Sequence, residues 1–122
     1  MKAGDTFLLP DWTGRHLHVV LAILDDGTTI LCHFTTRRRH SDPTCLIQPG
    51  EHSFVIVETA VRFDQTYFCS DAGLQALERD IVKRFEPLSE ALLQKVRQGA
   101  LDSPQTPDKI KNALRGLPWQ IP

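Results

Sequence analysis

The stretch of sequence that decides the fold is residues 16–35, which reads His16-Leu-His-Val-Val-Leu-Ala-Ile-Leu-Asp-Asp-Gly-Thr-Thr-Ile-Leu-Cys-His-Phe-Thr35. Two runs of apolar and β-branched residues, 16–24 and 29–35, flank the pair Asp26-Gly27. An Asp-Gly pair between two such runs is the strongest short-range signal for a β-hairpin. The sequence therefore predicts two antiparallel strands joined by a two-residue turn at Asp26 and Gly27.

This predicted turn also sets which residues face each other across the hairpin. Three cross-strand pairs follow from it: His16 with Arg37, His18 with Thr35, and Val20 with His33. Side chains alternate between the two faces of a strand. One face is then apolar, with Leu17, Val19, Leu21, Ile23, Ile30, Cys32 and Phe34, and the other is polar, with His16, His18, His33, Thr35 and Arg37. A slip of one residue would bury the histidines and expose the apolar residues. The resulting loss of apolar burial disfavours that register.

The polar face holds three of the five histidines beside a hydroxyl and a guanidinium. These are the groups that RNA cleavage requires: a base for the 2′-hydroxyl, a cation for the phosphate and an acid for the leaving oxygen. Histidine titrates near neutral pH and can act as either base or acid. Arginine binds phosphate through paired hydrogen bonds, and the run Arg37–Arg39 next to the cluster can follow a nucleic-acid backbone.

Two other interpretations of the same residues remain open from the sequence. The outer face of a half-buried antiparallel sheet is commonly polar, so the cluster can be a solvated surface. Three histidines and a water also form a catalytic zinc site, and His16, His18 and His33 have suitable strand spacing. No H-E-x-x-H motif or paired-cysteine motif accompanies them. We therefore expect no metal and no cofactor, and we expect Cys32, Cys45 and Cys69 to be reduced structural thiols.

The rest of the chain predicts more short strands and then helices. Strands are expected at 6–9, 45–47, 54–57, 60–63 and 67–69, each bounded by turn-forming or polar residues. Three helices are expected, each beginning at a capping residue: Ser70 or Asp71 for the first, Ser89 for the second, and Thr106 for the third, with Pro107 in its first helical position. The second helix is expected to end at Gly99 and the third at Gly116. The predicted fold class is α+β: a small antiparallel SH3-like barrel or curled sheet, about residues 1–70, with C-terminal helices, about 71–116, in a single domain spanning 1–122.

Composition narrows the class of protein. The chain has 122 residues, 41% of them hydrophobic and 24% charged, with a formal net charge of -1. These values are those of an ordinary globular domain and exclude a disordered chain or a coiled coil. The longest apolar run, 19–24, is far shorter than the roughly 20 residues of a membrane helix, and the first residues lack the apolar stretch of a signal peptide. We therefore expect a cytoplasmic protein with no membrane partner.

Several short motifs, in order, resemble the PemK/MazF family of toxins from bacterial toxin-antitoxin systems. The matches cover roughly residues 3–100, and residues 101–122 have no counterpart in the family. The motifs are Gly4-Asp5 before the first strand, the segment 15–21 as the second strand, Phe34-Thr35-Thr36 at the end of the third, the segment 61–65, and Leu-Ser-x-x-Leu-Leu at 88–93. The resemblance implies an SH3-like barrel with helices, a homodimer, metal-independent cleavage of single-stranded RNA, and inhibition by a cognate antitoxin protein.

The resemblance also assigns roles to residues of this chain. The family's threonine at the end of the third strand falls on Thr35, and its strand-two arginine falls on His16. We therefore predict His16 as base or acid, Thr35 as the phosphate-positioning group, Arg37 as the cation, and His18 as an assisting catalytic group. The expected RNA-binding residues are Arg15, His33, Thr36, Arg38 and Arg39. The substitution of histidine for the family's arginine also supports an alternative function, a non-catalytic barrel that binds a protein or nucleic acid, as a gyrase-poisoning toxin does.

Overall fold

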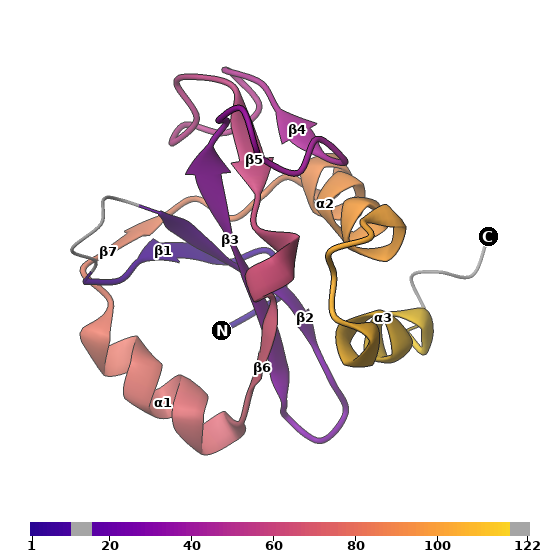
Figure 1. Cartoon of the computed structure of the whole chain (residues 1–122). Coiled ribbons are helices and arrows are strands. Elements are labelled where there is room, and N and C mark those ends of the chain that lie inside the picture. Colours follow the sequence, from indigo (N-terminus) through magenta and orange to yellow (C-terminus); the bar gives the residue numbers. More distant parts are fainter. Residues whose placement is uncertain (11–15, 118–122) are drawn as a thin grey trace.

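The computed structural model describes residues 1–10 and 16–117, and within them the chain forms strands first and helices afterwards (Figure 1). In chain order the elements are β1 (Thr6–Leu8), β2 (Leu17–Ile23), β3 (Thr29–Thr36), β4 (Leu46–Ile47), β5 (Thr59–Val61), the short 3-10 helix η1 (Phe63–Gln65), β6 (Tyr67–Cys69), α1 (Asp71–Asp80), β7 (Lys83–Phe85), α2 (Glu90–Asp102) and α3 (Asp108–Arg115). The α+β prediction is therefore confirmed.

The strands form one antiparallel sheet in the order β4-β5-β3-β2-β1-β7. The long strand β3 lies at its centre and pairs with β5 through Phe34–Thr36 and with β6 through Thr29–Leu31. Within the described residues β4 and β7 end the order, so the sheet is not closed. The curled-sheet form of the prediction is the one observed. None of the helices in the described segments is long and apolar enough to cross a bilayer.

The hairpin of β2 and β3 differs from the predicted register by two residues at its histidine end. The turn holds three residues, because the amide of Leu24 donates to the carbonyl of Thr28 at 2.8 Å and Gly27 closes the loop at a φ of 87°. A second shift follows at a β-bulge between Val20 and Ala22. The side chain of Ile23, predicted in the core, is consequently 38% exposed.

These two one-residue shifts cancel in their effect on side-chain direction. The observed pairs are His18 with His33 and Val20 with Leu31, in place of the predicted partners Thr35 and His33. Since a shift of two residues preserves the alternation of a strand, the histidines still point away from the main core. The bulge is held from the other side, where the guanidinium of Arg97 on α2 donates to the carbonyl of Leu21 at 2.9 Å.

Both faces of the hairpin are covered. The main core gathers the predicted apolar face of β2 and β3 with side chains of α2 and α3, among them Val96, Ile110 and Leu114. A second, smaller cluster lies on the histidine side of the sheet and consists of Phe7, Val20, Leu31, Cys69 and Leu74. Because Leu74 belongs to α1, that helix covers one end of the histidine face. The face is thus not a simple solvated surface.

Most predicted caps are observed. The hydroxyl of Ser70 accepts from the amide of Gly73, and that of Ser89 accepts from the amide of Leu92. Gly116 follows the last residue of α3, as expected. The predicted cap at Thr106 is wrong: this residue is buried, α3 begins at Asp108, and Pro107 precedes it without a side-chain cap.

Two further expectations are corrected by the structure, and one strand was not foreseen. Gly99 does not end α2, which continues to Asp102, because the glycine is needed for close packing against Cys45 rather than as a stop. The segment 54–57 is a loop and not a strand, and strand β7 was not predicted. The three cysteines, all among the described residues, are buried and form no disulfide.

Candidate active site

Three histidine rings, from His16, His18 and His33, lie together on one face of the sheet; we call them the histidine cluster. The ring centroids of His16 and His33 are 5.3 Å apart, and those of His18 and His33 are also 5.3 Å apart. The ring of His18 stacks on that of Phe7 at 5.7 Å with an interplanar angle of 11°. All three imidazoles are half-buried. The sequence prediction that these histidines gather on one face is therefore matched by the geometry.

The tautomer of His16 is set by the neighbouring strand. Its Nδ1 lies 3.2 Å from the carbonyl oxygen of Phe34. Because a carbonyl oxygen can only accept a hydrogen bond, the neutral ring carries its proton on Nδ1. The other nitrogen, Nε2, is then the one that can take up a proton, which is the form a general base requires.

The middle ring of the cluster, His33, is neutral at pH 7. Its pKa is lowered to about 4, chiefly by burial and then by the electrostatic effect of His18, His16 and Arg62, whereas the carboxylate of Asp64 opposes the shift. The imidazole group therefore loses its proton readily in this environment. An anion placed against the cluster would raise the pKa of His33, because it favours the charged ring.

A second group of the site, the ion pair of Arg62 and Asp64, was not predicted to lie there. The guanidinium of Arg62 donates from Nε and Nη2 to the two carboxylate oxygens of Asp64, both at 2.9 Å. The amide of Arg62 donates to the carbonyl of His33 at 2.9 Å, which places the pair beside the cluster. The spacing of Arg and Asp two residues apart was visible in the sequence, but their nearness to His33 depends on the pairing of β5 with β3.

The structure does not place Arg37 beside His16 as predicted. Its guanidinium binds Glu58 at 2.6 Å, and the carboxylate of Glu58 also accepts from the amide group of Gln48 at 2.8 Å. The physical reason is the register, since β3 pairs with β5 at this end and brings the residue before β5 next to Arg37.

The remaining predicted residues lie at the end of β3 and beyond it. Thr35 is half-buried and shares the strand face of His33, whereas Thr36, Arg38 and Arg39 are exposed. Arg15 lies outside the described residues. Within residues 1–10 and 16–117, no group of three His, Cys, Asp or Glu side chains is placed to hold a metal ion.

We expect the lowered pKa of His33 to make the protein less stable in acid. The unfolded histidine has a pKa near 6.5 and the folded one near 4, so between these values the unfolded state binds a proton that the folded state does not. The stability from this group is complete above pH 6.5 and is lost as the pH falls through the window. Denaturant titrations across that range should show that the unfolding free energy of His33→Gln falls less steeply with decreasing pH than that of the wild type. The difference between the two slopes corresponds to the uptake of up to about one proton on unfolding. Equal slopes for the two proteins would contradict the assignment, and His40→Gln, which alters an exposed loop histidine, is the control.

Comparison with known proteins finds a likeness in fold among solved structures. No family model matches the sequence, and no curated protein matches it. Among solved structures, an endoribonuclease in complex with its cognate antitoxin from a mycobacterial species matches with a TM-score of 0.55 and 12% identity, over 82% of this chain and 90% of the other. This likeness shows a shared fold.

Proposed function

We propose that this protein is a toxin-type endoribonuclease that cuts single-stranded RNA without a metal ion, as PemK/MazF toxins do. The observation that carries the proposal is the histidine cluster, in which the ring of His33 lies 5.3 Å from those of His16 and His18 and the carbonyl of Phe34 orients the His16 ring through Nδ1. The fold shared with a solved endoribonuclease supports the same reaction class.

The proposed step is an attack of the RNA on its own backbone. The 2′-oxygen bonds to phosphorus while its proton passes to Nε2 of His16. The bond from phosphorus to the 5′-oxygen breaks, and that oxygen receives a proton from His33, assisted by His18. His33 carries this proton once the anionic phosphate against the cluster has raised its pKa. The products are a 2′,3′-cyclic phosphate and a free 5′-hydroxyl. Proton transfers of this kind each contribute about 10²–10⁴-fold to a rate.

Cations and a hydroxyl complete the proposed site. Arg62 lies beside the cluster, because its amide donates to the carbonyl of His33, and its charge acts on the His33 ring, which supports a role for it as the cation. Thr35 lies on the same strand face and positions the phosphate. The RNA backbone continues from the cluster, where His33 lies, over the end of β3 and the residues after it: Thr36, Arg37, Arg38 and Arg39. Arg15, outside the described residues, keeps its proposed RNA-binding role. The pair of Arg37 with Glu58 opens when a phosphate replaces the carboxylate.

The proposal extends to partners. The solved structural neighbour is bound to its cognate antitoxin. We accordingly propose a cognate antitoxin protein as the partner of this chain, a homodimer as its working state, and the cytoplasm as its location.

We expect purified protein to cut a single-stranded RNA in the presence of a chelator and to leave the matching 2′-O-methyl RNA intact. Methylation removes the nucleophile without changing the bases or the phosphates. The measurement is gel analysis of both strands, with mass spectrometry of the new 3′ end to detect the cyclic phosphate. Cleavage of both strands, or of neither, would reject the mechanism.

A second function, a non-catalytic module that binds a protein or nucleic acid, is favoured by one observation. Two guanidinium groups near the site are already neutralised, Arg37 by Glu58 and Arg62 by Asp64. Such pairs weaken the positive field that stabilises a phosphorane. Growth arrest on expression with intact RNA and altered DNA supercoiling would select this function, including its gyrase-poisoning form.

A further inference from the structure

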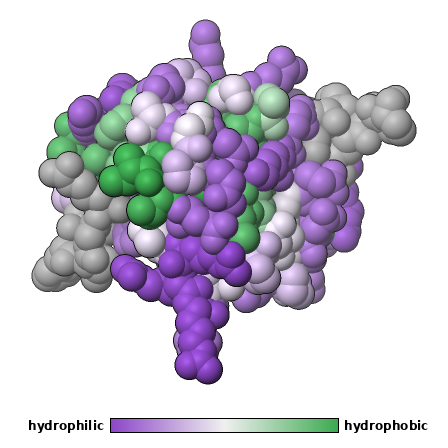
Figure 2. All heavy atoms as spheres, turned by 90° about the horizontal axis from the view of Figure 1, so that it is seen from above, coloured by the Kyte–Doolittle hydropathy of each residue, from purple (hydrophilic) through white to green (hydrophobic). Residues whose placement is uncertain are grey.

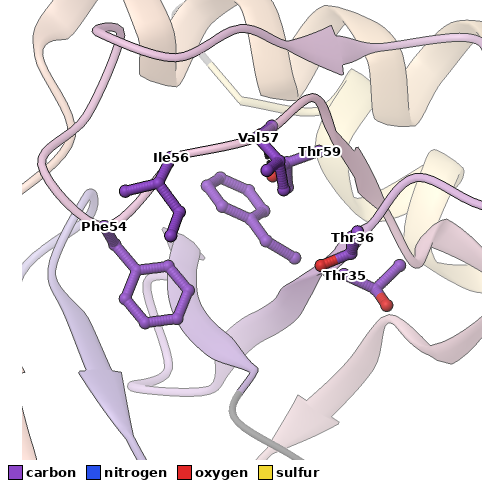
Figure 3. A pocket seen from close by; sticks show the side chains of 7 residues that line it. Thr35, Thr36, Phe54, Ile56, Val57 and Thr59 are labelled. Atoms are coloured by element: carbon purple, nitrogen blue, oxygen red, sulfur yellow. Dashed lines mark hydrogen bonds between the residues drawn. The ribbon is translucent and has the colours of Figure 1, made fainter.

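A groove of about 290 Å³ lies at the end of β3, opposite the loop of residues 48–58 between β4 and β5, which we call the groove loop. Phe54 and Ile56 project from the loop on one side, and Thr35 and Thr36 lie on the other (Figure 3). The groove is lined by Phe34, Thr35, Thr36, Phe54, Ile56, Val57 and Thr59. It is thus an apolar slot with hydroxyl groups at one wall.

The apolar wall of the groove is exposed to solvent. Ile56 is 82% exposed and Val57 is 48% exposed, although both are aliphatic. Viewed from the end that carries β4 and β5, the surface shows a compact hydrophobic patch among hydrophilic neighbours (Figure 2). An exposed apolar patch rimmed by polar groups is typical of a binding site.

The aromatic wall is held in place before any ligand binds. The ring of Phe54 meets that of Phe85 edge-on, with centroids 5.3 Å apart. The amide of Phe54 donates to Nδ1 of His52 at 3.1 Å, and Nε2 of the same buried ring donates to the carbonyl of Glu86 at 2.8 Å. The groove loop is therefore tied to the segment around β7. A fixed ring keeps the entropic cost of stacking a ligand against it low.

The charges around the groove indicate an anionic ligand with flat rings. The wall residue Thr36 is followed directly by Arg37 and by the exposed Arg38 and Arg39. Behind the aromatic wall, the ammonium group of Lys83 lies 4.8 Å from the ring centroid of Phe85. Three carboxylates oppose these cations: Glu58 through its pair with Arg37, Glu86 through its contacts with Ser53 and His52, and Glu51 through its pair with Lys95. An apolar slot between cations suits single-stranded nucleic acid, whose bases stack on apolar rings while its phosphates meet basic groups.

The groove also adjoins the histidine cluster. Thr35 borders the groove and points its hydroxyl away from the space beside Phe54, whereas Thr36 points its hydroxyl toward it (Figure 3). Thr35 lies two residues from His33 on the same strand face, a separation of about 7 Å. A phosphate held at the cluster by Thr35 therefore brings the adjoining nucleotide to the mouth of the groove.

We propose that this groove binds one nucleobase of the RNA substrate, stacked against Phe54 and Ile56 with its polar edge toward Thr36. This assignment rests on the proposed function for the identity of the substrate. It makes the groove the part of the protein that selects which base lies next to the cut, because the histidine cluster contacts groups that all nucleotides share.

The test is the binding of short 2′-O-methyl oligonucleotides, measured by fluorescence anisotropy at low salt, so that cleavage plays no part. Poly-A, poly-C and poly-U strands are compared with an abasic strand that keeps the same phosphates. Ile56→Ser and Phe54→Leu should weaken binding to at least one base-containing strand by about tenfold and leave the abasic strand unchanged. Ile56→Ser alters an exposed side chain and so keeps the fold. Phe68→Leu, an aromatic 40% exposed on β6 at the opposite end of β3, is the matched control and should bind like the wild type.

Equal binding by wild type and both groove variants would overturn the assignment, as would an equal loss on the abasic strand. Sedimentation that shows Ile56→Ser turning a dimer into a monomer would assign the groove to a second copy of the chain instead. Wild-type binding that depends on the groove, without cleavage of 2′-hydroxyl RNA, would support the groove and reject only the nuclease. Failure of the wild type to bind any of the strands would reject both.

Discussion

His16→Ala should lower the rate of cleavage of single-stranded RNA by roughly 10²–10⁴-fold, the contribution of one general base. Its Nδ1 donates to the carbonyl of Phe34, and this bond orients the ring and places the accepting nitrogen at Nε2. Alanine removes both. The half-buried ring contributes little to the core, so the melting temperature should change by only a few degrees. Single-turnover rates with a fluorescent RNA, measured across pH, give the comparison.

The matched control is His40→Ala, which removes an exposed histidine of the loop after β3. It should cut RNA at the wild-type rate and show the same pH profile. Loss of activity in both variants would indicate that histidine content, and not the cluster, affects the assay. Full activity in His16→Ala would show that another group takes the proton, and the base would then have to be sought elsewhere.

The sequence could predict those residues of the site that lie on the hairpin of β2 and β3. The alternation of His16 and His18 with Leu17 and Val19 fixes which side chains share a face, and that alternation survives errors of an even number of residues. The turn at Gly27 and the bulge before Ala22 each moved the register by one. The cluster was therefore found although each predicted pair was wrong.

The rest of the site depends on contacts between segments distant in the chain, which no local pattern specifies. Arg62 joins His33 through the pairing of β5 with β3, and Glu58 reaches Arg37 through the same pairing. Within the groove loop, residues 54–57 were predicted to be a strand, whereas the structure forms a loop there. Its exposed Ile56 shows that these residues form a surface, and a surface cannot be told from a core by hydrophobicity alone.

The second large effect expected concerns Gly99, where the sequence predicted a helix end and the structure shows a close contact. A Cβ added at this position would lie 2.7 Å from that of Cys45 and 2.9 Å from Cζ of Phe63. Both neighbours are buried, so neither can move away without disturbing the core. Glycine is here because α2 lies directly against the loop before β4 and against η1, and any side chain would separate them.

Gly99→Ala should therefore destabilise the protein by about 1–2 kcal/mol, although alanine gains about 1 kcal/mol over glycine in a helix interior. Gly99→Val, with two more carbons in the same space, should lose about 3 kcal/mol. Each kcal/mol corresponds to roughly 4 °C in melting temperature for a chain of this size. Calorimetry or denaturant titration of both variants gives the values.

Gly116→Ala is the control for this series, because its added Cβ would lie 3.6 Å from the carbonyl oxygen of Ala113, an ordinary contact. Its φ of -80° is open to any residue, so the substitution should change stability by less than about 0.5 kcal/mol. A rise in melting temperature for Gly99→Ala would mean that the helix preference of alanine outweighs the contact. The glycine would then matter only for its backbone conformation, as the sequence alone suggested. The space between α2 and its neighbours would have to be larger than the observed contacts indicate.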